Sequence, residues 1–252
     1  MSFTSARFSR SRGRTPWRDG AAPLQVGGLT PLSATDYPGQ LAAVVFCQGC
    51  PWRCAYCHNP HLLSRRGGSE IAWTDVVAFL ERRRGLLDAV VFSGGEPTLQ
   101  PALPAAIQAV KAMGFKIGLH TAGIVPARLK DVLPLLDWVG MDVKAPFDDY
   151  ASITGVAGSG ARASTSAQLI LASGVDCEFR TTFHSALLAH EAVVKIADKL
   201  SAMGAHHYAL QAFRAAGCAA PALTATAHAG HLDPAFRDEL APRFDTLIVR
   251  GA

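Results

Sequence analysis

Four of the six cysteines in the chain lie between Cys47 and Cys57. Such a concentration of soft thiolate ligands suits an iron–sulfur cluster or a tetrahedral zinc ion, and little else. The last three follow the spacing Cys50-x3-Cys54-x2-Cys57, with an aromatic residue, Tyr56, directly before the last. The sequence therefore predicts a metal centre in this loop, with Cys50, Cys54 and Cys57 as ligands.

Two other uses of these cysteines are open. A structural zinc site could take Cys47 as its fourth ligand, although zinc ligand pairs usually come from two separated knuckles. A disulfide framework is disfavoured because a chain of 252 residues, 49% of them hydrophobic, can bury a core without cross-links. Cys47 follows an apolar run, so we expect it to pack as a small apolar residue at a strand end.

The net charge of +4 comes from the first twenty residues, where five arginines face Asp19 alone, five minus one. The rest of the chain is neutral, which argues against a nucleic-acid partner. We interpret residues 1–22 as a disordered Arg-rich leader, although a mitochondrial transit peptide has a similar composition. Residues 23–252 are expected to form one domain. No run of eighteen apolar residues occurs, so we expect no membrane association and a cytoplasmic protein.

Short apolar runs alternate with segments of helical periodicity through most of the chain. This alternation predicts an α/β fold in which parallel strands are joined by right-handed crossovers, as in an open, incomplete barrel. Residues 24–32 are mixed in character, and residues 155–166, rich in Gly, Ala and Ser, are predicted to be a loop. The predicted strands are 41–46, 89–93, 116–120, 138–142, 176–183 and 208–212; the predicted helices are 73–84, 103–113, 126–136, 164–172 and 191–203, with a last helix at 233–240 and a closing strand at 246–249.

Polar groups follow the predicted strands where each apolar run ends, and parallel α/β folds place their chemistry at those ends. After one strand, Gly94 and Gly95 would let a ligand approach the backbone, and the neighbouring Glu96 could accept from an ammonium group. Taken singly, each group could belong to a turn or a surface ion pair. Together they predict one binding site, and the groups at the other strand ends are His120, Thr121, Asp142, Lys144, Arg180 and Gln211.

Several strings resemble the anaerobic ribonucleoside-triphosphate reductase activating proteins of the radical S-adenosylmethionine (SAM) superfamily, relatives of the pyruvate formate-lyase activating enzyme. The cysteine loop and Gly94-Gly95-Glu96 carry most of this resemblance. The weaker strings are Asp36 to Gly39, Phe46 to Cys50, Cys57 to Pro60, Pro97 to Gln100, Asp142 to Pro146 and Arg180 to Thr182.

The resemblance implies a partial (β/α)6 TIM-like barrel with a [4Fe-4S] cluster and SAM as cofactors. Cys50, Cys54 and Cys57 would hold three irons, leaving the fourth open to SAM. No residue beyond the cluster would be catalytic. Ala122 stands where the family has an Asn, which removes one expected hydrogen bond. The residues implied in SAM binding are Tyr56, Gly94, Gly95, Glu96, Thr121, Asp142, Lys144, Arg180 and Gln211.

The implied reaction is reductive cleavage of SAM to methionine and a 5′-deoxyadenosyl radical, which takes a hydrogen atom from a glycine of a partner glycyl radical enzyme. Flavodoxin or ferredoxin would supply the electron. A radical SAM enzyme acting on a small molecule or peptide, and a zinc-stabilised binding protein, are the alternatives. Cys177 and Cys218 stand apart, which argues against a second cluster, and we interpret Cys218, His228 and His231 as solvated residues rather than a metal site.

Overall fold

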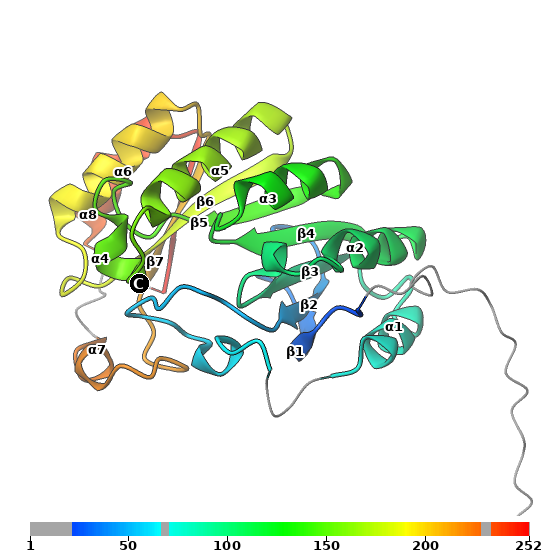
Figure 1. The fold of residues 1–252 in the computed structure, drawn as a ribbon. Coiled ribbons are helices and arrows are strands. Elements are labelled where there is room, and N and C mark those ends of the chain that lie inside the picture. Colours follow the sequence, from blue (N-terminus) through cyan, green and yellow to red (C-terminus); the bar gives the residue numbers. More distant parts are fainter. Residues whose placement is uncertain (1–21, 67–70, 228–232, 252) are drawn as a thin grey trace, which may run out of the picture.

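The computed structural model describes residues 22–66, 71–227 and 233–251. Its strands form one curved sheet in the order β1 to β8, and helices cover the outer face of this sheet (Figure 1). The strands are β1 Val26–Ser33, β2 Ala42–Cys47, β3 Ala89–Gly94, β4 Lys116–Thr121, β5 Trp138–Asp142, β6 Asp176–Phe183, β7 His207–Ala212 and β8 Thr246–Arg250. The α-helices are α1 Trp73–Glu81, α2 Leu103–Ala112, α3 Pro126–Val132, α4 Tyr150–Thr154, α5 Ser159–Ser173, α6 His190–Ala202, α7 Pro221–Ala225 and α8 Pro234–Leu240.

Every neighbouring pair from β2 to β8 is parallel, and β1 joins β2 in the antiparallel direction. Consecutive parallel strands joined by helices form the repeating unit of a TIM-like barrel. The sheet order runs from β1 to β8 without pairing these two strands, so the barrel is partial. The predicted α/β fold is confirmed, and its six predicted strands are β2 to β7.

Side chains alternate between the two faces of the sheet, as the strand pleat requires. Val45 and Phe92 belong to the large core between the sheet and its helices, whereas their neighbours Val44 and Val91 point to the inner face. On that inner face Tyr37 stacks on Trp138 with ring centroids 5.2 Å apart. This apolar layer is the floor beneath the polar strand ends.

The structure corrects the predicted loop at residues 155–166, because α5 begins at Ser159. Gly155 and Gly158 adopt φ of 67° and 71°, and these left-handed residues end α4 and start α5. A Cβ on Gly160 would lie 1.8 Å from the Phe147 carbonyl oxygen. The small residues that suggested a loop therefore allow close packing of a helix.

The mixed segment at 24–32 contains most of β1, whose half-buried residues hide the alternation of a strand. The last predicted helix and the closing strand are confirmed as α8 and β8. Residues 1–21 of the predicted leader, with His228 and His231, lie outside the described residues. Within the described ranges, no helix combines the length and the apolar character needed to cross a bilayer.

Candidate active site at the carboxyl ends of the strands

One cavity of about 510 Å³ lies at the carboxyl ends of the parallel strands. It brings together residues from the cysteine loop and from the ends of β3, β4, β5, β6 and β7. All the predicted site residues except Glu96 line it: Cys50, Cys54, Tyr56, Cys57, Gly94, Gly95, Thr121, Asp142, Lys144, Arg180 and Gln211. The tertiary structure therefore assembles the predicted site from six separate segments.

The cysteine loop leaves β2 and runs toward α4 and α7 (Figure 1). Its backbone is held from two sides. The Cys50 N–H donates to the Leu63 carbonyl at 3.1 Å, and farther along the Arg53 and Ala55 N–H groups donate to the last carbonyls of α4 at 2.9 and 3.0 Å. Trp52, only 1% exposed, packs edge-on against Tyr150 of α4. These contacts fix the loop across the mouth of the barrel.

Cys50, Cys54 and Cys57 are free thiols that are partly buried in the cavity wall. Burial raises the pKa of the Cys50 thiol to about 12 and also raises that of Cys54. A bound cation would offset the cost of burying a charged thiolate, and the thiolate is the form of cysteine that binds metals. Three thiolates facing one cavity fit an iron–sulfur cluster.

Cys47 has a different environment from the other three. It is fully buried and packs in the core on the helix side of the sheet. In the described part of the chain, no three His, Cys, Asp or Glu side chains lie close enough to share one metal ion. A tetrahedral zinc, with Zn–S bonds of about 2.3 Å, would need such a group. Cys47 therefore stands apart from the three thiols that face the cavity.

The two glycines at the end of β3 pack against the start of the cysteine loop. Gly94 adopts φ of 111°, and a Cβ there would lie 2.4 Å from the Cys47 nitrogen. A Cβ on Gly95 would lie 2.4 Å from the Gly49 carbonyl oxygen, and the Gly95 N–H donates to the Cys47 carbonyl at 2.8 Å. Glycine is therefore required here by backbone contact between β3 and the loop, in addition to any contact with a ligand.

Glu96 lies beneath the cavity and is fully buried. Its carboxylate accepts from the Thr98 N–H at 3.1 Å and hydroxyl at 2.6 Å, from the Thr121 hydroxyl at 2.8 Å and from the Ala122 N–H at 2.9 Å. Burial raises its pKa, while these four hydrogen bonds act in the opposite direction. The side chain that could have accepted from a ligand's ammonium group is occupied by protein donors, and it joins the end of β3 to the end of β4.

Asp142 and Lys144 form an ion pair in the cavity wall, with the Lys144 Nζ 3.1 Å from the Asp142 Oδ2. Burial alone would lower the pKa of Lys144, but Asp142 outweighs it and the pKa is raised. Burial alone would raise the pKa of Asp142, but Lys144 and then Arg180 outweigh it and the pKa is lowered. Both groups are therefore charged at neutral pH, and together they suit a ligand that carries charges of both signs.

Tyr150 of α4 holds the backbone on both sides of this ion pair. Its hydroxyl accepts from the Lys144 N–H at 3.0 Å and donates to the Asp142 carbonyl at 3.1 Å. Because the same short helix also accepts the hydrogen bonds of the cysteine loop, α4 connects the two walls of the cavity.

Arg180 is 7% exposed and is fixed in the cavity wall by its neighbours. Its Nε donates to Glu178 at 2.8 Å, its Nη1 lies 3.1 Å from His120 Nε2, and its guanidinium lies 4.9 Å from the Trp138 ring centroid. Burial, followed by the charge of Arg180, lowers the pKa of His120 to about 4, so this imidazole is neutral at pH 7. Arg180 is thus a rigid cation rather than a mobile one.

Several residues that the sequence did not single out as site residues also line the cavity, among them Asp36, His58 and Arg214. His58 Nε2 lies 2.9 Å from the Arg214 carbonyl oxygen, across 156 positions of sequence. A Cβ on Gly217 would lie 2.5 Å from the His58 carbonyl oxygen. The segment after β7 therefore folds back onto the cysteine loop, a contact for which no local sequence signal exists.

Comparison with known proteins agrees with this geometry. Residues 44–206 match the profile described as "Radical SAM superfamily". A Methanocaldococcus jannaschii protein named as a glycyl-radical enzyme activating enzyme is 32% identical over 197 residues, which cover 75% of this chain and 79% of the relative. The pyruvate formate-lyase-activating enzyme of Clostridium pasteurianum is 35% identical over 137 residues, which cover 52% of this chain and 57% of that enzyme.

Two solved structures share the fold at low sequence identity. Streptococcus suis SuiB bound to its precursor peptide SuiA has a TM-score of 0.61 and 13% identity, over 83% of this chain and 48% of SuiB. A radical SAM methyltransferase from Sphaerobacter thermophilus has a TM-score of 0.58 and 18% identity, over 85% of this chain and 67% of that protein.

A partial TIM-like barrel with a three-cysteine loop at its mouth defines a class of metal-dependent α/β enzymes. The chain belongs to the radical SAM superfamily. Its cofactors are accordingly a [4Fe-4S] cluster and SAM.

Proposed function

We propose that this protein is an activase that generates a glycyl radical in a partner enzyme, and that the partner is an anaerobic ribonucleoside-triphosphate reductase. The observation that carries the proposal is the placement of three cysteines and the Asp142–Lys144 ion pair in one cavity. The 32% identity to a relative named as a glycyl-radical enzyme activating enzyme supports the reaction class. The strings from Asp36 to Gly39 and from Asp142 to Pro146 support the choice of partner.

In this proposal Cys50, Cys54 and Cys57 would hold the cluster. Asp142 and Lys144 would bind the charged groups of the methionine end of SAM, because a carboxylate pairs with an ammonium and an ammonium with a carboxylate. The remaining SAM contacts come from the Gly94 and Gly95 backbone and from Tyr56, Thr121, Arg180 and Gln211. Glu96 acts from beneath, by holding the ends of β3 and β4 together.

When bound, the reduced cluster and SAM supply the one-electron cleavage that allows hydrogen abstraction from a carbon atom. The chain's own residues orient the substrate and exclude water. A glycine suits this reaction because it has no side chain to obstruct the approach of its Cα, and a loop that carries it can enter the cavity. No side chain of this protein has to act as a general acid or base.

The proposal extends to the wider context of the protein. We assign residues 23–252 to one radical SAM domain and 1–22 to a leader. All six cysteines are free, which suits a reducing compartment, so we place the protein in the cytoplasm. A flavodoxin or ferredoxin is the proposed electron donor.

The test is an anaerobic incubation of the cluster-loaded protein with SAM, a reductant and an anaerobic ribonucleoside-triphosphate reductase. Electron paramagnetic resonance should show a glycine-centred radical in the reductase. Cys54→Ala should abolish the signal, and Cys177→Ala, which alters a cysteine outside the cavity, should retain it. Cleavage of SAM without a radical in this reductase or in any other glycyl radical enzyme would contradict the proposal.

A further inference from the structure

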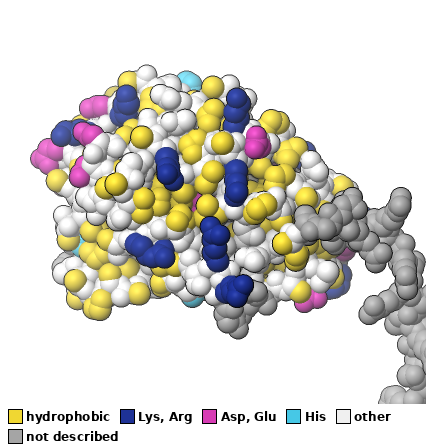
Figure 2. Space-filling model, viewed as in Figure 1, with side chains coloured by type: hydrophobic (Ala, Val, Ile, Leu, Met, Phe, Trp, Pro, Cys, Tyr) yellow, Lys and Arg dark blue, Asp and Glu magenta, His cyan; other side chains and the backbone are white. Residues whose placement is uncertain are grey.

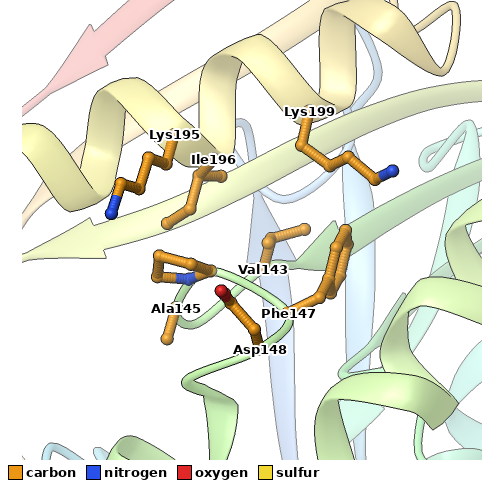
Figure 3. A pocket seen from close by; sticks show the side chains of 8 residues that line it. Val143, Ala145, Phe147, Asp148, Lys195, Ile196 and Lys199 are labelled. Carbon is orange, nitrogen blue, oxygen red and sulfur yellow. The ribbon is translucent and has the colours of Figure 1, made fainter.

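A second cavity, of about 350 Å³, lies outside the barrel between α6 and the segment that connects β5 to α4. We call it the outer cavity. Figure 3 shows Lys195, Ile196 and Lys199 reaching toward this segment from α6. The lining is largely apolar and is completed by Val143, Ala145, Pro146, Phe147 and Asp148.

The outer cavity shares its wall with the candidate active site. Along the extended segment after β5, Val143 and Ala145 line the outer cavity, whereas Asp142 and Lys144 line the active-site cavity. The Val143 N–H donates to the Arg180 carbonyl at 2.7 Å, and the Val143 carbonyl accepts from the Thr181 hydroxyl at 2.8 Å. Both backbone groups of Val143, in the wall between the two cavities, are therefore held in place by β6.

Lys195 and Lys199 stand one helical turn apart and are both exposed. Neither takes part in an ion pair with another described residue, whereas Asp198 between them pairs with Arg243. Like charges four residues apart on a helix repel each other, and a nearby anion removes this penalty. Asp148 is the single carboxylate of the lining, so the two lysines leave the rim with a net positive charge.

The surface around the outer cavity also combines apolar and cationic side chains. The face that carries α5 and α6 shows Lys and Arg side chains among apolar patches, with acidic side chains mainly toward its margins (Figure 2). An apolar floor with a cationic rim is complementary to a protein segment that presents an apolar side chain between carboxylates.

We infer that the outer cavity docks an acidic segment of the glycyl-radical partner, with an apolar side chain on the floor and carboxylates beside Lys195 and Lys199. This inference rests on the proposed function. The partner has to place one glycine in the active-site cavity, so binding contacts outside that cavity must hold it there. The outer cavity provides such contacts without competing with SAM or with the glycine loop.

The test uses the cluster-loaded full chain with the glycyl-radical protein that it activates. Lys195→Glu/Lys199→Glu reverses the rim charge, and Lys116→Glu/Lys130→Glu makes the same change in net charge at exposed positions outside the outer cavity. We expect the first variant to raise the KM for the partner about tenfold or more, with kcat and partner-free SAM cleavage unchanged. The second variant should match the wild type. Rising salt should raise the KM of the wild type, by screening the attraction, and lower that of the first variant, by screening the repulsion that the charge reversal introduces.

Each other result has a distinct meaning. If the wild type activates no glycyl-radical protein, the proposed function fails and this inference fails with it. If the wild type is active and both variants have its KM, the inference alone is overturned. A loss of partner-free SAM cleavage in Lys195→Glu/Lys199→Glu would show that the lysines act on the active site through the shared segment, and it would overturn the docking inference. A salt-sensitive dimer of the wild type, absent from this variant, would assign the cavity to a second copy of the chain.

Discussion

Tyr150→Phe removes a single oxygen atom at the point where α4 meets the active-site wall. The ring should keep its edge-on contact with Trp52 and its stacking with Phe147. What is lost is the acceptor of the Lys144 N–H and the donor to the Asp142 carbonyl. We expect this variant to lose the hydrogen bonds that position Lys144 while it keeps the ring contacts of the core.

The size of the effect follows from the two backbone groups left without partners. An unsatisfied buried polar group costs about 1–3 kcal/mol, and the Lys144 N–H is buried. The Asp142 carbonyl is at the edge of the cavity, where water can replace part of the lost bond. We therefore expect the free energy of unfolding to fall by about 2–3 kcal/mol, which lowers the melting temperature of a chain of this length by about 4–12 °C.

The functional effect should appear in SAM binding. A shift of the segment moves the Lys144 ammonium away from Asp142, so SAM affinity should fall about tenfold, while kcat at saturating SAM changes less than about threefold. The assays are thermal unfolding and anaerobic SAM titration of the cluster-loaded protein. Tyr37→Phe, which retains its stacking on Trp138, should leave both within the error of the wild type. Destabilisation without any loss of SAM affinity would refute the positioning role of Tyr150.

Three further predictions concern single side chains. Cys54→Ala should lower the iron content from about four per chain to below one. Cys47→Ala should retain the iron and lower the free energy of unfolding by about 1 kcal/mol through lost packing. Equal iron loss in both variants would show that the ligand assignment is wrong. Glu96→Gln places an amide against one of its donors, such as the Ala122 N–H, and should lower the free energy of unfolding by about 2–4 kcal/mol. An unchanged melting temperature would contradict the role of Glu96 in joining the ends of β3 and β4. Burial lowers the pKa of His120 to about 4 from 6.5, so the unfolded chain gains a proton in this window that the folded chain does not. The free energy of unfolding should fall by about 3 kcal/mol as the pH drops from 6.5 to 4, and His120→Gln should flatten this slope; equal slopes would disprove the assignment.

Local sequence patterns were sufficient for the parallel strands and for most of the site. The strands β2, β3 and β5 are mostly apolar because both faces of a barrel strand are covered, and polar residues stand at or just after the ends of these runs. Arg180 differs, because it lies within β6 and is followed there by Thr181, Thr182 and Phe183. Parallel strands place these ends on one side of the sheet, so Asp142, Arg180 and Gln211 could be assigned to one cavity from their positions alone. The cysteine spacing carried the cofactor prediction, because few other structures use three thiolates so close together.

The sequence predicted a helix at residues 164–172 but could not distinguish the first turn of α5 from a loop. Ser, Ala and Gly are common in loops, but here Gly160 permits the helix to approach Phe147. The role of Glu96 was equally hidden, because the donors that surround its carboxylate come from Thr98, Thr121 and Ala122, on two different segments. The local sequence shows which chemical groups a residue carries, but tertiary packing determines which residues it contacts.

What the sequence determined by itself was the inventory of chemistry: three thiolates, a Gly-Gly-Glu turn and charged residues at the ends of parallel strands. Only the tertiary structure decided which contacts hold these groups in place. It buries Glu96 beneath the site and connects the cysteine loop to Lys144 through α4, whereas the burial of Cys47 in the core was already expected from its apolar run. The physical reason is that a buried polar group must find its hydrogen-bond partners wherever the fold brings them, and those partners are distant in sequence.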